Sequence, residues 1–166
     1  MANPGNAIRN CIKDYIDRWG APLEVLQEVN VGFHFVGRPR KMDIVIRNKE
    51  NNRYLAIECK VQLTGGTAYE KLFYTLEDCA SVPIPTIIVF AGPAIQNDIK
   101  SRLVMSGRGI EVDFEMQGEK VTRFQDPNSL LKQRCYIELG LNWFEFATGD
   151  KIKEQLKGLG YKRSGT

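Results

Sequence analysis

The chain has 166 residues, of which 43% are apolar and 26% are charged, and its net charge is +3 at pH 7. This length and composition predict one domain with a hydrophobic core, and the mild positive charge permits nucleic-acid binding without requiring it. The longest apolar run, residues 87–91, is too short to span a bilayer, and residues 1–10 lack the apolar core of a signal peptide, so we expect no membrane or targeting segment.

Apolar residues at regular spacing predict the elements of the N-terminal half. Asn3 and Pro4 are residue types of a helix N-cap and first helical position, and apolar residues then recur at helical spacing up to Trp19. Thr67, with Glu70 three residues later, predicts the capping box of a second helix. Between these helices lie three predicted strands, residues 29–35, 41–47 and 53–63.

The C-terminal half is less regular. Residues 85–90 are a short apolar run typical of a central strand covered on both faces, and because this run follows a helix we expect it to lie parallel to the preceding strand. A further helix is predicted to start at Pro93, and a strand over 110–116. Residues 129–146 fit neither period, and 151–158 have the pattern of a short basic helix. The order predicts an α/β fold, a mixed β-sheet with helices on both faces.

Four isolated cysteines are spread along the chain, at Cys11, Cys59, Cys79 and Cys135. None has the close partner that a zinc site or a redox motif requires, so we expect reduced thiols. Reduced thiols indicate a cytoplasmic protein.

The second and third predicted strands form a hairpin whose register follows from its apolar residues. A symmetric turn at residues 50–51 opposes three apolar pairs, which would share one buried face. These pairs are Ile46 with Leu55, Ile44 with Ile57, and Met42 with Cys59. The same register places Asp43 opposite Glu58 on the other face, followed at period two by Lys60 and Gln62. Opposed carboxylates repel each other, so such a pair is kept more readily when a cation lies between them.

Asp43 and Glu58 are therefore the candidate metal ligands. Paired carboxylates suit Mg²⁺, which could activate a water and polarise a phosphate. Lys60 could orient that water or stabilise charge on the phosphate, and Gln62 is a candidate fourth active-site group. Two alternatives stay open: an ordinary cross-strand charge cluster, and a Gln62 that only faces solvent.

Basic and backbone groups close to these acids are candidate contacts for DNA phosphates. They are Arg38, Arg40, Lys41, Gly66, Thr67 and Lys71. The first three directly precede Asp43, so at least one is expected to bind a phosphate. The others surround a predicted helix N-terminus, where backbone N–H groups favour anions, although a simple turn and a solvated lysine remain alternatives. Tyr69, Phe73 and Tyr74 are expected to pack rather than to stack on bases.

The pattern of Asp43 followed by Glu58-Cys59-Lys60 resembles the PD-(D/E)XK nuclease superfamily, and residues 58–72 look like a segment of some type II restriction endonucleases. The resemblance implies a restriction-endonuclease-like fold and a magnesium-dependent endonuclease that hydrolyses DNA as a homodimer. It also implies that Mn²⁺ substitutes for Mg²⁺ and that the backbone carbonyl of Cys59 is a further metal ligand.

We therefore expect one nuclease domain over residues 1–166, with a core at about 7–116 and a C-terminal extension, 129–166, whose structure is not predicted. Two alternative functions stay open. One is a structure-selective resolvase of the Holliday-junction type, which would bind branched DNA far better than linear duplex. The other is a non-catalytic DNA-binding subunit that keeps the nuclease fold, against which the intact set of Asp43, Glu58 and Lys60 argues. An RNA-processing nuclease is a third possibility, but no single-strand-binding motif supports it.

Overall fold

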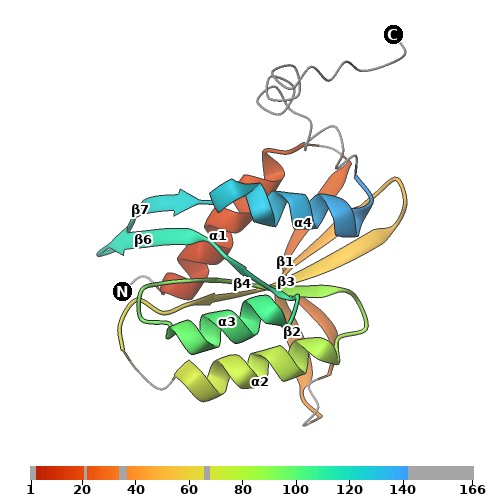
Figure 1. Cartoon of the computed structure of the whole chain (residues 1–166). Coiled ribbons are helices and arrows are strands. Elements are labelled where there is room, and N and C mark those ends of the chain that lie inside the picture. The colour runs from red at the N-terminus through yellow and green to blue at the C-terminus, as the bar shows by residue number, and fades with distance from the viewer. Residues whose placement is uncertain (1–2, 21, 34–36, 66–67, 142–166) are drawn as a thin grey trace, which may run out of the picture.

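A five-stranded mixed sheet forms the centre of the computed structural model, which describes residues 3–20, 22–33, 37–65 and 68–141 (Figure 1). Its strands lie in the spatial order β1-β2-β3-β4-β5. They are β1 (Leu23–Phe33), β2 (Pro39–Asn48), β3 (Arg53–Val61), β4 (Thr86–Ala91) and β5 (Gly109–Glu111). The first three strands pair antiparallel, whereas β3, β4 and β5 pair in parallel. The predicted parallel placement of the 85–90 strand is confirmed.

Helices cover both faces of this sheet. On one face lie α1 (Pro4–Asp17) and α4 (Leu130–Leu139), and on the other lie α2 (Ala68–Ala80) and α3 (Asn97–Met105) (Figure 1). Every residue of β4 is buried, as expected for a strand between two helical layers. The predicted fold class, a mixed sheet with helices on both faces, is thus confirmed.

Local sequence explains where α1 begins and which face it buries. The side chain of Asn3 accepts a hydrogen bond from the N–H of Gly5 at 2.9 Å, and Pro4 occupies the first turn, where its missing N–H costs nothing. Ile8, Ile12 and Ile16 follow at four-residue spacing and are fully buried. The helix therefore lies with one apolar stripe against the sheet.

The alternation of side chains along β1 is interrupted near Glu28, which has a left-handed backbone with φ of 54°. Val25 packs on the α1 side, but Val29, four residues later, packs on the opposite side. A left-handed residue inside a strand breaks the two-residue alternation, which explains this switch. Met42, which pairs with Val29, follows it, so the predicted pairing of Met42 with Cys59 on one buried face is wrong. Met42 instead packs with Val45 and Ala56.

The C-terminal elements differ most from the sequence prediction. The helix expected from Pro93 is α3, which starts only at Asn97, and the strand expected over 110–116 is divided at Val112. Its second half, β6 (Asp113–Gln117), pairs with β7 (Lys120–Gln125) in a separate hairpin. A short 3₁₀ helix, η1 (Pro127–Ser129), then leads into α4.

The helix α4 has a weak helical pattern because apolar residues lie on two of its sides. Leu131, Cys135 and Leu139 are buried in the main core, but Leu130 and Ile137 are half exposed. The start of the helix is instead stabilised by a residue that precedes it. The carboxylate of Asp126 accepts the backbone N–H groups of Leu131 and Lys132 at 2.9 and 3.0 Å. Residues 142–166, including the predicted basic helix, lie outside the described structure.

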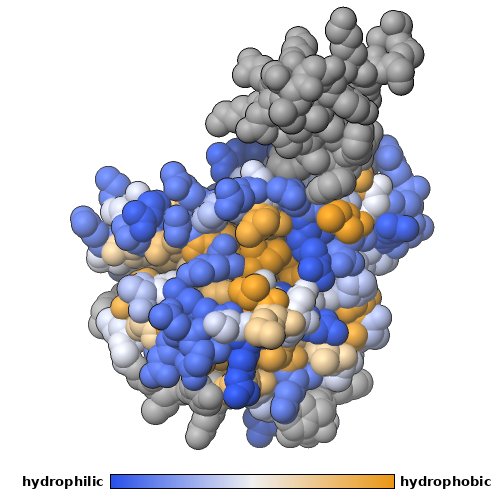
Figure 2. Space-filling model, viewed as in Figure 1, coloured by the Kyte–Doolittle hydropathy of each residue, from blue (hydrophilic) through white to orange (hydrophobic). Residues whose placement is uncertain are grey.

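The face of the molecule seen in Figure 2 is largely hydrophilic, with apolar groups gathered around α3 and α4. The large exposed apolar side chains of these two helices are Val104, Met105, Leu130 and Ile137. Within the described residues, no helix is long and apolar enough to cross a membrane. All four cysteines are free thiols, as predicted.

Candidate active site

The strands β2 and β3 separate at Asp43. Their ladder runs from the turn to the pair of Ile44 with Ile57, in the predicted register. The next N–H on that side of β3, that of Cys59, donates to the carboxylate of Asp43 at 2.7 Å instead of to a strand carbonyl. The Asp43 side chain therefore lies between the diverging strands, held by a backbone hydrogen bond.

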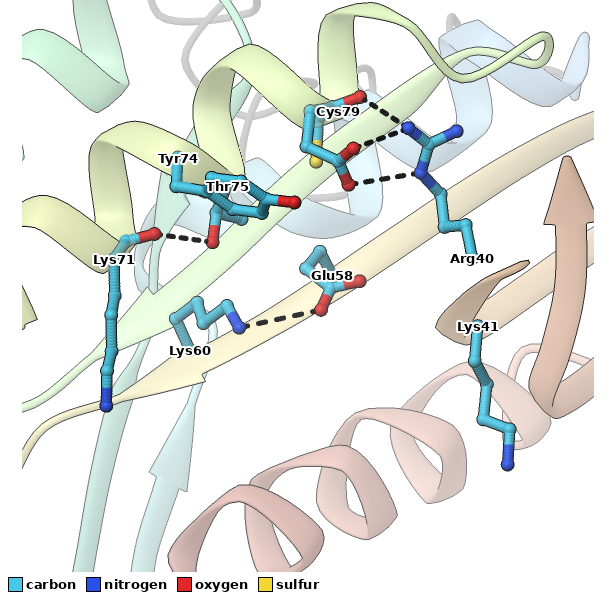
Figure 3. A pocket seen from close by; sticks show the side chains of 9 residues that line it. Arg40, Lys41, Glu58, Lys60, Lys71, Tyr74, Thr75 and Cys79 are labelled. Carbon is cyan, nitrogen blue, oxygen red and sulfur yellow. Dashed lines mark hydrogen bonds and ion pairs between the residues drawn. The ribbon is translucent and has the colours of Figure 1, made fainter. Parts of the chain in front are cut away.

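Glu58 and Lys60 lie on the face of β3 that is turned toward α2 (Figure 3). They line a pocket of about 440 Å³, and the Lys60 Nζ is 3.6 Å from the Glu58 Oε1. The Glu58 side chain is only 18% exposed, while that of Lys60 is 38% exposed. The two residues are separated by one position, so the period of the strand places both side chains in the same pocket.

The surroundings of Glu58 disfavour the ionised form of its carboxyl group. Burial, together with the negative charge of Asp43, raises its pKa from the usual 4.5 to about 8, against the opposing effect of Lys60. A buried carboxylate beside a second carboxylate is a favourable place for a divalent cation. The positive charge of the cation offsets both the cost of burial and the repulsion between the two carboxylates.

The backbone hydrogen bonds of β3 indicate the direction of the Cys59 carbonyl, the third candidate ligand. The N–H groups of Ala56 and Gln62 bind carbonyls on the β4 side, of Pro85 and Ala91, whereas that of Cys59 is directed to Asp43. Because the N–H and C=O groups of one strand residue point the same way, the Cys59 carbonyl is also directed to the β2 side. The candidate oxygen ligands around the point where the strands separate are thus two carboxylates and one carbonyl.

These donors fit a small, hard cation such as Mg²⁺, which binds oxygen ligands and keeps several waters. In the part of the chain that the structure describes, no group of three or more acidic, histidine or cysteine side chains is arranged to hold a metal. The protein ligands of an ion here would therefore be Asp43, Glu58 and the carbonyl of Cys59.

Comparison with models of known families identifies the family of the chain. The model of the PD-(D/E)XK nuclease superfamily domain matches residues 5–130. This chain belongs to the PD-(D/E)XK nuclease superfamily. The resemblance predicted from Asp43 and the Glu58-Cys59-Lys60 tripeptide is confirmed.

Comparisons with individual proteins give less information about the chain. No curated protein matches the chain. Among solved structures, one match is SfsA of Pyrococcus furiosus in complex with Ca²⁺, at 12% sequence identity and a TM-score of 0.43. That match covers 74% of this chain and 62% of the SfsA chain.

The remaining predicted site residues of this PD-(D/E)XK domain are only partly brought to the pocket. Lys41 and Lys71 line it on opposite sides of the Glu58–Lys60 pair, and Arg38 is exposed just before β2 (Figure 3). Gln62 follows β3 and does not line the pocket; its carbonyl accepts the N–H of Ala94 at 3.3 Å. Gly66, Thr67 and the predicted capping box lie outside the described side chains.

The sequence prediction that Arg40 contacts a phosphate is wrong. Its side chain is buried, and its Nε and Nη2 atoms bind the carboxylate of Asp78 at 3.1 and 2.6 Å. The Nη2 atom also donates to the hydroxyl of Ser81 at 2.7 Å. A guanidinium that is buried and already paired cannot reach a DNA phosphate. Arg40 instead fixes β2 against the C-terminal end of α2, and so helps to shape the pocket wall.

We expect Asp78→Ala to destabilise the protein by about 3–5 kcal/mol, because it leaves the buried Arg40 charge uncompensated. Urea unfolding monitored by circular dichroism measures the loss. The matched control is Glu115→Ala, which breaks the ion pair with Arg123; both partners there are about half exposed, so the cost should stay under about 1 kcal/mol. Equal losses in the two variants would contradict a structural role for the Arg40–Asp78 pair.

Proposed function

We propose that this PD-(D/E)XK protein is a metal-dependent DNA endonuclease, with Mg²⁺ as its ion and Mn²⁺ as a substitute. The observation that supports it most is the pair of carboxylates at the point where β2 and β3 separate. Asp43 is held there by a backbone N–H, and Glu58 is buried beside it with a pKa raised to about 8. Lys60 completes the set, 3.6 Å from Glu58.

Each residue has a distinct role in this proposal. Asp43, Glu58 and the Cys59 carbonyl hold the ion, which when bound makes a water more acidic and neutralises the leaving oxygen of the phosphodiester. Lys60 orients the attacking water and stabilises the negative charge that grows on the phosphate. Lys41 and Lys71, at the two sides of the pocket, contact neighbouring phosphates of the same strand.

The proposed class of endonuclease, a type II restriction endonuclease, follows from the resemblance of the sequence to these enzymes. Two cuts in a duplex need two active sites, so the active form in this proposal is a homodimer. Arg38, Gly66 and Thr67 are further candidate contacts to the DNA backbone. Four reduced thiols fit a reducing compartment such as the cytoplasm.

Cleavage of plasmid DNA should require Mg²⁺ or Mn²⁺ and stop in excess chelator. Ca²⁺ should support binding without cleavage, because it accepts the same oxygen ligands in a looser geometry than the chemistry tolerates. A nicking assay run beside a gel shift, with each ion in turn, measures both properties. Cutting that continues in chelator would contradict the metal mechanism. Binding without cutting in every ion would favour the non-catalytic subunit.

A further inference from the structure

The pocket beside the two carboxylates extends well past them, along α2. Its α2 wall is formed by Tyr74, Thr75 and Cys79, and Figure 3 shows the Tyr74 side chain extending along that wall, above Lys60 and Glu58 in this view. Thr75 and Cys79 are buried, whereas Tyr74 is 38% exposed. The sequence predicts that Tyr74 packs, whereas in the structure Tyr74 lines the pocket and is partly exposed.

Charge is distributed unevenly in this pocket. The cation deepest in it, Arg40, is already bound to Asp78, and Lys60 lies beside Glu58. The cations that remain, Lys41 and Lys71, are exposed and lie on opposite sides of the pocket (Figure 3). The interior therefore suits an uncharged group, while its edges suit phosphates.

The size of the pocket limits what can enter. A volume of about 440 Å³ lies within the range of about 300–1,000 Å³ that is usual for small-molecule pockets, so one nucleotide fits and a stacked duplex does not. An aromatic side chain in such a pocket offers a surface on which any base can stack.

We infer that the pocket receives one unpaired nucleotide of the cleaved strand, beside the phosphate attacked at the metal site, with its base against Tyr74. The strand backbone then passes between Lys71 and Lys41. The preferred substrate class is thus DNA with an unpaired or easily extruded nucleotide at the cleavage position, since a fully paired duplex must first lose the pairing and stacking of that base. This inference rests on the proposed nuclease function.

A binding measurement tests the pocket without requiring cleavage. The probe is a short oligothymidylate with one central 2-aminopurine, whose fluorescence falls when the base stacks, titrated with protein in Ca²⁺. We expect quenching with the wild-type protein and with Tyr74→Phe, which keeps the ring. Tyr74→Ala should lose the quenching and bind about tenfold more weakly. The matched control is Tyr54→Ala, because Tyr54 is 39% exposed but lies at the other end of β3, outside the pocket.

A cleavage measurement then tests the substrate class. Wild-type protein in Mg²⁺ should cut a duplex with one unpaired central nucleotide about tenfold faster or more than the fully paired duplex, and Tyr74→Ala should lose this preference. Equal or faster cutting of the paired duplex would overturn the inference while leaving the nuclease function intact. Absence of cutting on all substrates would contradict the nuclease function. The quenching result would then decide by itself whether the pocket receives an unpaired nucleotide. Equal quenching by Tyr74→Ala and wild-type protein would overturn the inference in either case.

Discussion

Asp43→Asn and Glu58→Gln should each reduce DNA cleavage by at least about a thousandfold in Mg²⁺, because each removes one of the two charged metal ligands of the proposed mechanism. These replacements keep the shape of the side chain. The point matters most at Asp43, whose carboxylate accepts the Cys59 N–H at 2.7 Å: asparagine retains an oxygen for this bond, whereas alanine would leave a part-buried donor without a partner. Single-turnover cleavage measures the loss.

The stability of the metal-free protein provides the control for Glu58→Gln. The pKa of Glu58 is raised from 4.5 to about 8, so between these values the folded protein holds a proton that the unfolded chain has released. The wild-type protein should therefore lose stability as the pH rises through this window. Glu58→Gln lacks this penalty, and its melting temperature should exceed that of the wild type by several degrees near pH 8 but match it near pH 4.

Two outcomes would contradict the assignment of these carboxylates. One is full cleavage activity in either variant under saturating Mg²⁺. The other is a Glu58→Gln protein that is much less stable than the wild type at pH 8, because the carboxylate would then be a structural group rather than a strained metal ligand.

Lys60→Ala should slow the chemical step by about a hundredfold or more while leaving DNA binding nearly unchanged. The Lys60 ammonium lies 3.6 Å from the Glu58 carboxylate. In the proposed mechanism it acts from there on charge that appears mainly in the transition state. An interaction made only in the transition state affects the rate constant more than the affinity. Single-turnover cleavage at saturating protein, beside the salt dependence of binding, separates the two effects.

Two further lysines make this test sharper. Lys41→Ala should show the opposite pattern, with weaker binding and a smaller salt slope, because Lys41 is exposed at the side of the pocket and would bind a phosphate. Lys49→Ala should change neither property, since Lys49 follows β2 in the turn at the far end of the hairpin. If Lys60→Ala cleaves at the wild-type rate on saturated DNA, Lys60 only contacts the backbone.

The sequence by itself determined the core of the candidate site. The pairing of Ile44 with Ile57 could be predicted because a symmetric turn opposes apolar residues on one face of the hairpin, and a slip by one residue would break these pairs. The neighbouring residues Asp43 and Glu58 were thereby placed together. These interactions are local, formed within one hairpin of two short strands, so the residue pattern suffices to predict them.

The tertiary structure decided what surrounds these residues. Arg40 looks like a phosphate contact in the sequence, but it is buried by α2, where Asp78 lies 38 positions further along the chain. Likewise the left-handed Glu28 turns Met42 away from Cys59, and the wall of α2 makes Tyr74 part of the pocket. Hydrophobic periodicity reports which face of an element is buried but not which element covers it. Contacts between distant segments therefore become visible only when the helices are packed on the sheet.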